Sequence, residues 1–279
     1  MLAANARGFF SIIDFSEPNV EAAKKTYVKL HESTVNRIHY KPEFNGFFSC
    51  DRNGHIKFSL LFNNEIKEKG NVYAGTMEPV RDLSSSLSKL VSAHEDKTLR
   101  IWNLATFKEE SKIDAHGSDV TSVDWHPSKS LVASGGKDRL VKVWDLHTNK
   151  SICSLFNHTN TINSLAFNKH RDLFVSAGKD QIVRVFDTRT FKELYSLNGH
   201  AAEIYSVQWN PAVPYSIISA DVSGRICVWS LPNCLPIDVQ VHTANFYVPR
   251  CAFDNRGEHV LSSGYDKSLK LWKVMKKDQ

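Results

Sequence analysis

Cysteine is scarce in this sequence, and its spacing fits no metal or disulfide pattern. The 279 residues include five cysteines, and no Cys-x-x-Cys pair occurs among them. Zinc modules use closely spaced ligand pairs, and a disulfide framework uses an even number of cysteines. We therefore expect neither kind of module, and a reducing compartment is the natural interpretation.

Long apolar runs are missing as well. No run approaches the roughly 20 apolar residues that a membrane-spanning helix needs, and the first residues do not read as a secretory signal. Hydrophobic residues make up 42% of the chain and charged residues 23%, which is typical of a globular protein with a full core. The net charge of +5 is compatible with an acidic partner such as nucleic acid, and equally with an ordinary solvated surface. We expect no membrane association.

Short alternating segments are abundant, and they repeat. The clearest copy runs from Asp119 to Leu146, where three alternating segments are separated by His-Pro-Ser and by Gly-Gly-Lys-Asp, as expected of short strands joined by tight turns. A copy has a Ser four residues before a turn Asp, and an aromatic residue six residues after that Asp. Such copies are Ser92, Asp96, Trp102; Ser134, Asp138, Trp144; Ser176, Asp180, Phe186; and Ser262, Asp266, Trp272.

Two further copies are degenerate. Ser219, Ser223, Trp229 lacks the Asp, and Ser49, Asn53, Ser59 lacks both the Asp and the aromatic residue. The turn positions of all six copies follow one another at 42 or 43 residues, the length of a four-stranded propeller blade. The second copy has Ala74-Gly75 where the others have a His about 22 residues before the turn, at His31, His116, His158, His200 and His242.

The recurring Ser, Asp, aromatic and His positions, together with Trp144-Asp145, resemble those of the WD-repeat family. The resemblance implies an all-β fold, a WD-repeat β-propeller with six recognisable repeats. It also implies that the His, Ser, Asp and aromatic residue of a repeat form a buried hydrogen-bonded chain, which makes them structural tetrads. The tetrads implied here are His116, Ser134, Asp138, Trp144; His158, Ser176, Asp180, Phe186; and His242, Ser262, Asp266, Trp272.

The recurring Ser, His and Asp invite comparison with a catalytic triad. A triad occurs once in an enzyme, whereas these residues recur at the blade period, and no Gly-x-Ser-x-Gly elbow, Walker loop or Gly-rich dinucleotide turn accompanies them. The twelve histidines fall mostly one to a repeat and not at metal-ligand spacing. We expect no catalytic activity, no cofactor, no metal site and no small-molecule substrate.

The repeats divide the chain into an N-terminal segment 1–30, a propeller 31–274 and a tail 275–279. The last copy has no outer strand of its own, and the run from Lys24 to Leu30 stands where a strand could close a six-bladed ring. The run from Gly8 to Phe15 resembles an inner-strand end of a further repeat, which would make the chain an incomplete, truncated seven-bladed propeller. Both arrangements stay open, and we favour the ring that the chain can close by itself.

Three consecutive stretches, which begin at His31, Glu78 and Asp119, resemble repeats of the WD-repeat subunit of the cleavage and polyadenylation factor. The resemblance implies a non-catalytic nuclear scaffold in pre-mRNA 3′-end processing. It implies as partners a large propeller-rich subunit, a zinc-finger subunit and the poly(A) signal of pre-mRNA. A WD-repeat adaptor or substrate receptor in another protein-only complex, such as a ubiquitin ligase, is the alternative.

Candidate RNA-binding residues come from the same resemblance. In that family the RNA contacts come largely from a basic N-terminal segment, which this sequence does not contain, and from the strand entering the next repeat. In that strand Tyr27 matches an apolar contact position that could stack on a base, whereas Lys24 stands where the family has an aromatic residue. We expect Tyr27, Lys24 and Lys25 to be the RNA-binding residues, and a scaffold role is the stronger expectation.

Overall fold

The computed structural model describes residues 2–4, 7–12, 26–62, 65–73, 78–244 and 246–274. The chain forms two compact units, an N-terminal unit (Met1–Val120) and a C-terminal unit (Thr121–Gln279). In the described residues all regular structure is β-strand apart from two short 3-10 helices, η2 (Pro42–Phe44) and η3 (Leu231–Asn233). No helix in these ranges is long and apolar enough to cross a bilayer.

The N-terminal unit contains three antiparallel sheets with strand orders β1-β2-β3, β4-β5-β6-β7 and β11-β10-β9-β8. Their strands are β1 (Leu2–Ala4), β2 (Phe9–Ile12), β3 (Thr26–Lys29), β4 (Val35–Lys41), β5 (Gly46–Asp51), β6 (Ile56–Phe62), β7 (Glu65–Tyr73), β8 (Val80–Ser85), β9 (Lys89–His94), β10 (Thr98–Asn103) and β11 (Glu109–Asp114).

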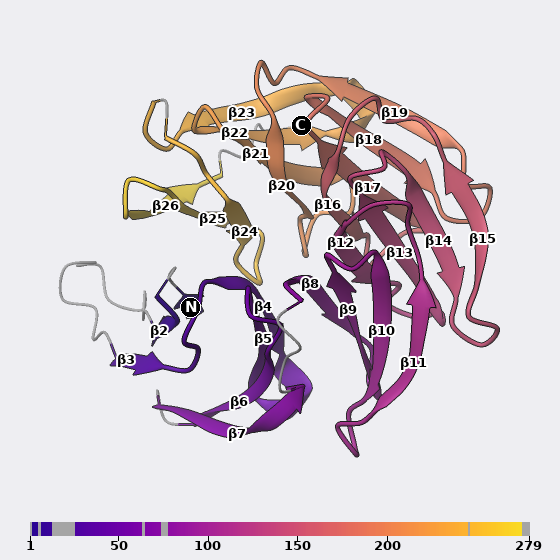
Figure 1. Ribbon diagram of the computed structural model, residues 1–279. Coiled ribbons are helices and arrows are strands. Elements are labelled where there is room, and N and C mark those ends of the chain that lie inside the picture. Colours follow the sequence, from indigo (N-terminus) through magenta and orange to yellow (C-terminus); the bar gives the residue numbers. More distant parts are fainter. Residues whose placement is uncertain are drawn as a thin grey trace. The chain divides into compact units, whose positions relative to one another are not determined.

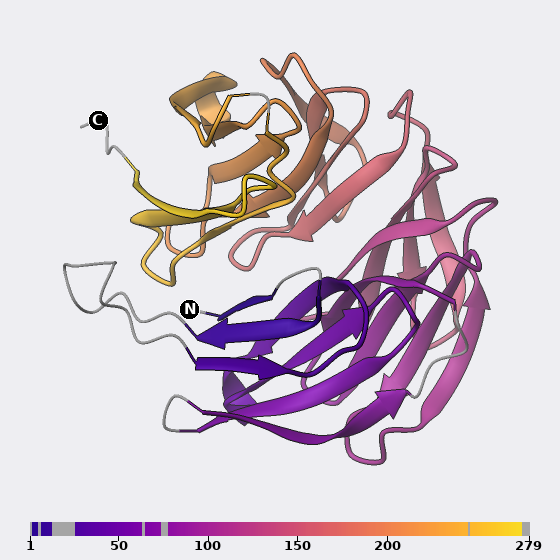
Figure 2. The same ribbon diagram turned by 60° about the vertical axis from the view of Figure 1, so that its left-hand side comes forward.

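Apolar side chains join neighbouring sheets within this unit. Phe10 of β2 stacks on Phe47 of β5 with ring centroids 5.4 Å apart, and both rings are fully buried. Figure 2 shows the indigo N-terminal sheet beside the purple sheet that follows it. Trp102 of β10 packs with Phe48 and Phe58 of the preceding sheet in another cluster. Each sheet is therefore held to the next by large side chains on its facing surface.

The C-terminal unit contains four antiparallel sheets, three with four strands and one with three. Their strands are β12 (Val120–Trp125), β13 (Leu131–Gly136), β14 (Val141–Asp145), β15 (Lys150–Leu155), β16 (Ile162–Phe167), β17 (Leu173–Gly178), β18 (Ile182–Asp187), β19 (Glu193–Asn198), β20 (Ile204–Trp209), β21 (Ser216–Asp221), β22 (Arg225–Ser230), β23 (Leu235–Val241), β24 (Arg250–Phe253), β25 (His259–Ser263) and β26 (Leu269–Lys273).

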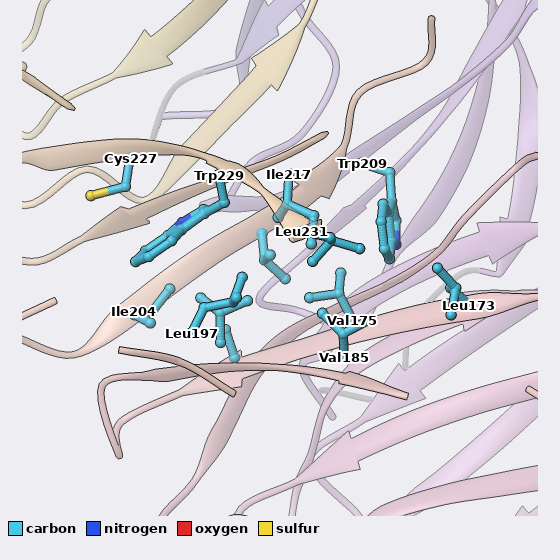
Figure 3. Close-up of a cluster of buried hydrophobic side chains, with 13 residues drawn as sticks. Leu173, Val175, Val185, Leu197, Ile204, Trp209, Ile217, Cys227, Trp229 and Leu231 are labelled. Atoms are coloured by element: carbon cyan, nitrogen blue, oxygen red, sulfur yellow. The ribbon is translucent and has the colours of Figure 1, made fainter. Parts of the chain in front are cut away.

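The strand pattern explains how these sheets stack. In the sheet β12-β13-β14-β15 the first strand is rich in β-branched and aromatic residues and the second strand is almost wholly buried, whereas half of the residues in the fourth strand are exposed. Figure 1 shows the sheets that begin with β16 and β20 as neighbours, and β16 contacts β20. In Figure 3 the rings of Trp209 and Trp229 lie at two ends of a cluster that is otherwise mostly aliphatic. The core is thus a series of layers between successive sheets.

The six sheets that follow His31 correspond one to one with the six repeats of the sequence. They confirm the predicted all-β fold built from propeller blades. The sheet β1-β2-β3 precedes them, and its β3 pairs with β2, with Phe9 opposite Lys29. Closure of a ring by the segment Lys24 to Leu30 stays a prediction.

Candidate functional site

The repeated His, Ser, Asp and aromatic side chains form buried hydrogen-bonded networks, which we call ties. The tie at His200 shows their geometry most fully. His200 Nδ1 lies 2.7 Å from Asp221 Oδ2, and its Nε2 lies 2.6 Å from Ser219 Oγ. The indole N–H of Trp229 donates to the same hydroxyl oxygen at 2.7 Å. One proton arrangement satisfies every group: Trp229 donates to Ser219, Ser219 donates to His200, and His200 donates to Asp221. A loop, two strands and a strand end are thereby held together.

The tetrad of the last sheet has the same kinds of partners, but the two imidazole nitrogens exchange them. His242 Nδ1 lies 2.6 Å from Ser262 Oγ, and its Nε2 lies 3.3 Å from Asp266 Oδ1. Trp272 donates its indole N–H to Ser262 at 2.7 Å. Thr243 donates a further hydrogen bond of 2.6 Å to Asp266, so the turn is held from two sides.

The tetrad at His158 has its hydroxyl and carboxylate but no indole. His158 lies 2.8 Å from Asp180 and 2.7 Å from Ser176. The Phe186 side chain has no N–H group, and its ring stacks on that of Phe174 with centroids 4.9 Å apart. The Ser176 hydroxyl therefore has one fewer hydrogen-bond donor than Ser219 has.

The tetrad expected at His116 is divided between the two units. In the C-terminal unit Trp144 donates its indole N–H to Ser134 at 2.8 Å, and Asp138 accepts the backbone N–H of Leu140 at 3.2 Å. His116 belongs to the N-terminal unit and is buried there.

The two degenerate copies keep a carboxylate at another position. Asp51 lies two residues after Ser49, and Asp221 lies two residues after Ser219. His31 contacts Asp51 at 3.0 Å and Ser49 at 2.8 Å, as His200 does in its own sheet. These copies lack the Asp at the turn position, as the sequence shows, but an Asp two residues earlier contacts the histidine instead. A Ser-x-Asp pattern at the end of the second strand was the signal that could have revealed it.

The second copy has a histidine at this same position. His94 lies two residues after Ser92, with its Nε2 2.7 Å from the Ser92 hydroxyl, and Trp102 donates to that hydroxyl at 2.8 Å. Ala74-Gly75, which replace the usual loop histidine, lie outside the described residues. In this sheet the imidazole that contacts the Ser92 hydroxyl is therefore that of His94, which lies in the same strand β9.

Burial and hydrogen bonding set the charges of these ties. Burial, together with the nearby Arg100 cation, lowers the pKa of His94 to about 3. Burial alone would raise the pKa of Asp96, but hydrogen bonds from Thr98 and Arg100 outweigh it and lower that pKa to about 2. The same balance, with a histidine as donor, lowers the pKa of Asp221. The carboxylates are thus ionised at neutral pH and His94 is neutral.

A second series of ties was not predicted. Asn168, at the end of the first strand, accepts the backbone N–H of His170 at 2.8 Å and donates to the carbonyl of Pro214 in the next sheet at 2.7 Å. Asn210 donates likewise to the carbonyl of Gly257 at 3.0 Å. The signal was present as an aromatic residue followed by a polar one, at Trp125-His126, Phe167-Asn168, Trp209-Asn210 and Phe253-Asp254.

The His200 tie has the atom order of a catalytic triad, but its surroundings do not suit catalysis. The side chains of His200 and Asp221 are 0% exposed, and Ser219 is fully buried as well. A nucleophilic hydroxyl must reach a substrate carbonyl, whereas this one already accepts an indole N–H in the core. Within the described residues no group of three or more His, Cys, Asp or Glu side chains is arranged to hold a metal ion.

The candidate RNA-binding residues are only partly described. Tyr27 lies in β3, where its backbone pairs with Ser11 of β2. Lys24 and Lys25 lie outside the described residues. Exposed aromatic side chains do occur on loops of the C-terminal unit: Phe246 is 45% exposed, and Tyr265 is 70% exposed with its ring 4.9 Å from that of Tyr247.

Sheet order and the recurring ties define a protein of tandem propeller blades. The model of the WD domain, G-beta repeat matches residues 68–103, 107–145, 149–187, 191–230 and 235–273, which is more than half of the chain. The chain therefore belongs to the WD-repeat family.

Two curated fungal proteins are similar to part of the chain. The polyadenylation factor subunit 2 of Gibberella zeae is 33% identical over 133 residues, which are 47% of this chain and 21% of that protein. The polyadenylation factor subunit 2 of Neurospora crassa is 31% identical over 133 residues, which are 47% of this chain and 19% of that protein. The match spans about a fifth of the length of these relatives.

Proposed function

We propose that this chain is a non-catalytic scaffold in nuclear pre-mRNA 3′-end cleavage and polyadenylation. The observation that carries the proposal is the similarity to two proteins named polyadenylation factor subunit 2. The partners that follow are other subunits of a polyadenylation complex, a large propeller-rich subunit and a zinc-finger subunit among them.

The ties support a scaffold role on physical grounds. In the described residues the Ser, His and Asp side chains that resemble catalytic groups hold strands together inside the core, as Ser219 does. A rigid blade presents its loops at fixed positions, and exposed aromatic side chains on such loops are typical anchors of protein interfaces. Phe246 and Tyr265 are exposed in this way on the C-terminal unit. We therefore propose that these loops dock a protein subunit.

Recovery of partners from nuclear extract tests the proposal. The tagged chain should co-purify with other polyadenylation subunits, and Phe246→Ala with Tyr265→Ala should reduce that recovery. Ile152→Ser is the matched control, because Ile152 is 47% exposed on the outer strand β15 and away from these loops. Recovery of a cullin adaptor without polyadenylation subunits would replace the proposal with the ubiquitin-ligase alternative. A tagged chain that stays out of the nucleus would also count against it.

A contribution to poly(A)-signal recognition is the finer part of the proposal. Its support is the position of Tyr27 in the strand just before His31, from which an aromatic ring could stack on an unpaired base. Tyr27→Ala should weaken binding of an AAUAAA oligomer, and Lys24→Gln with Lys25→Gln should reduce the salt dependence of that binding. Tyr27→Phe is the control that keeps the ring. Equal affinity of the wild type and Tyr27→Ala would remove Tyr27 from the site.

A further inference from the structure

A small cavity lies at one end of the sheet β12-β13-β14-β15 in the C-terminal unit. Its volume is about 290 Å³, and its lining comes from two short connecting segments. The lining residues are Asp138, Arg139 and Leu140, between β13 and β14, and Phe156, His158 and Thr159, between β15 and β16. All of them belong to one unit. The volume is at the lower end of the roughly 300–1,000 Å³ of small-molecule sites, so the cavity suits a single bulky side chain.

Two large apolar side chains form the walls of this cavity. Val141 of β14 pairs with Leu155 of β15, and Figure 1 shows the two strands side by side. Leu140 and Phe156 therefore stand opposite each other, one residue beyond that pair. Phe156 is 76% exposed, the largest fraction among the exposed large hydrophobic side chains of the described residues. A partner's apolar group that covered this surface would remove it from water, which favours binding.

Three other complete sheets do not have two apolar residues at these positions. The opposed residues there are Thr98 and Asp114, Ile182 and Asn198, and Arg225 and Val241. The Thr98 hydroxyl, for example, donates to the turn carboxylate of Asp96, and Leu140 has no such group. The blade does not need the apolar pair in order to fold, because the other sheets form with a polar residue at this place.

Arg139 places a positive charge without a countercharge beside the apolar pair. It occupies the left-handed position of the turn with φ 70°, its side chain is exposed, and it forms no ion pair with a described residue. By contrast, Lys129 of the same sheet pairs with Asp172 at 2.9 Å. An acidic group of a partner would supply the countercharge that Arg139 lacks.

The charges around the cavity favour a peptide over a nucleic acid. Asp138 also lines the cavity, and its carboxylate accepts the backbone N–H of Leu140 at 3.2 Å. A nucleic acid carries a negative charge at every phosphate, so a strand that crossed the cavity would bring phosphates close to this carboxylate. A peptide can present one acid to Arg139 and a neutral backbone to Asp138.

We propose that this cavity binds a segment of a partner protein in which a bulky apolar residue stands next to an acidic one. The apolar side chain packs against Phe156 and Leu140, and the neighbouring carboxylate pairs with Arg139. Aromatic and Arg side chains are the types enriched at protein interfaces. The inference does not depend on the proposed function, because it rests on the geometry of one blade and uses neither Phe246 nor Tyr265.

Peptide titrations of the full chain, followed by ligand-observed NMR, test this site. The probe is the peptide Gly-Asp-Phe-Asp-Gly, and its controls are Gly-Lys-Phe-Lys-Gly and Gly-Asp-Ser-Asp-Gly. The chain should bind the probe about fivefold more tightly than the Lys peptide, because opposite charges attract and like charges repel. It should not bind the Ser peptide measurably, since that peptide has no apolar side chain for the cavity. Hydrogen exchange of residues 138–140 and 156–159 should slow with the probe bound.

Variants separate recognition from folding. Phe156→Ser should abolish binding of the probe, Arg139→Gln should remove the preference between the Asp and Lys peptides, and Arg139→Glu should reverse it. Ile152→Ser is the control for Phe156, because Ile152 is an exposed apolar residue of the same sheet. Lys267→Gln is the control for Arg139, because Lys267 holds the same left-handed turn position in the last sheet, with φ 66°. Both controls should bind the probe as the wild type does.

Three results would overturn the proposal. The first is the absence of saturable binding of the probe. The second is binding that survives Phe156→Ser, or a preference for the Asp peptide that survives Arg139→Glu. The third is an oligouridine that binds the chain, is displaced by the probe and loses affinity with Phe156→Ser, which would make a nucleic acid the occupant. Unchanged thermal unfolding of Phe156→Ser shows that a loss of binding is not a loss of fold.

Discussion

Replacing Ser219 by Ala tests whether the buried ties stabilise the sheets. The substitution removes the hydroxyl that accepts the indole N–H of Trp229 at 2.7 Å and that lies 2.6 Å from His200. Both partners are buried, so each loses its hydrogen bond without gaining one to water. An unpaired buried polar group costs about 1–3 kcal/mol, and we expect Ser219→Ala to lower the free energy of unfolding by about 3 kcal/mol.

The chain offers a matched comparison in the preceding sheet. Ser176 contacts His158 at 2.7 Å, but the Phe186 side chain at the position of the tryptophan has no N–H group to donate. Ser176→Ala therefore leaves one polar partner unpaired instead of two, and it should cost about 1 kcal/mol less than Ser219→Ala. In a Trp229→Phe background the cost of Ser219→Ala should fall to that of Ser176→Ala, because only the imidazole of His200 then loses a hydrogen-bond partner.

Urea unfolding of the wild type, Ser219→Ala, Trp229→Phe and the double variant, which together form a double-mutant cycle, measures the effect. The coupling energy between Trp229→Phe and Ser219→Ala should be about 1 kcal/mol, since the two side chains share a hydrogen bond. Hydrogen exchange of the β21 and β22 amides assigns the change to the C-terminal unit and avoids assuming one transition for the whole chain. Equal costs for Ser219→Ala and Ser176→Ala, or a coupling energy of zero, would refute the reasoning.

Three further predictions follow from the core. The pKa of His94 is lowered to about 3 in the folded chain, so below pH 6.5 this imidazole takes up a proton only when the chain unfolds. As the pH falls from 6.5 toward 3, the free energy of unfolding should therefore decrease by up to about 1.4 kcal/mol per pH unit for this group. Urea titrations at pH 7 and pH 5 should show a smaller decrease for His94→Gln than for the wild type. A Cβ on Gly178 would lie 2.0 Å from the Thr161 carbonyl, so Gly178→Ala should cost about 3 kcal/mol in thermal unfolding, whereas Gly70→Ala, with nothing within 4 Å, should cost nothing. Burial raises the pKa of two thiols to about 12 and that of a third well above its usual value, so a thiol reagent at pH 7.5 should spare these residues until the chain unfolds, namely Cys227, Cys251 and Cys50.

Much of the fold could be predicted because each blade is a local unit. The 42- or 43-residue period and the alternation within each copy are written in consecutive residues, and one blade is one stretch of chain. The hydroxyls Ser134, Ser176 and Ser262 could be located for the same reason, since each lies at a fixed distance from its turn.

Other features depended on atoms from different stretches of the chain. Asp51 and Asp221 take the acid's role from a position two residues earlier, because a carboxylate at the strand end reaches the same imidazole that the turn Asp reaches elsewhere. His94 acts in a sheet whose usual loop position carries no histidine, and only its distance to Ser92 identifies it. The Asn168 and Asn210 ties became evident once the carbonyl acceptors of the following sheet were placed.

The sequence by itself determined the repeat, the blade boundaries and the resemblance to a polyadenylation factor subunit, because those rest on order and spacing along the chain. The tertiary structure decided which polar groups are buried, because burial depends on the sheet that packs against them. It also decided that Ser219, His200 and Asp221 lie within the core. The strand β26 is the clearest case: its alternating LKLWK sequence looks like the other third strands, but among the described residues Leu269 and Leu271 are 38% and 39% exposed.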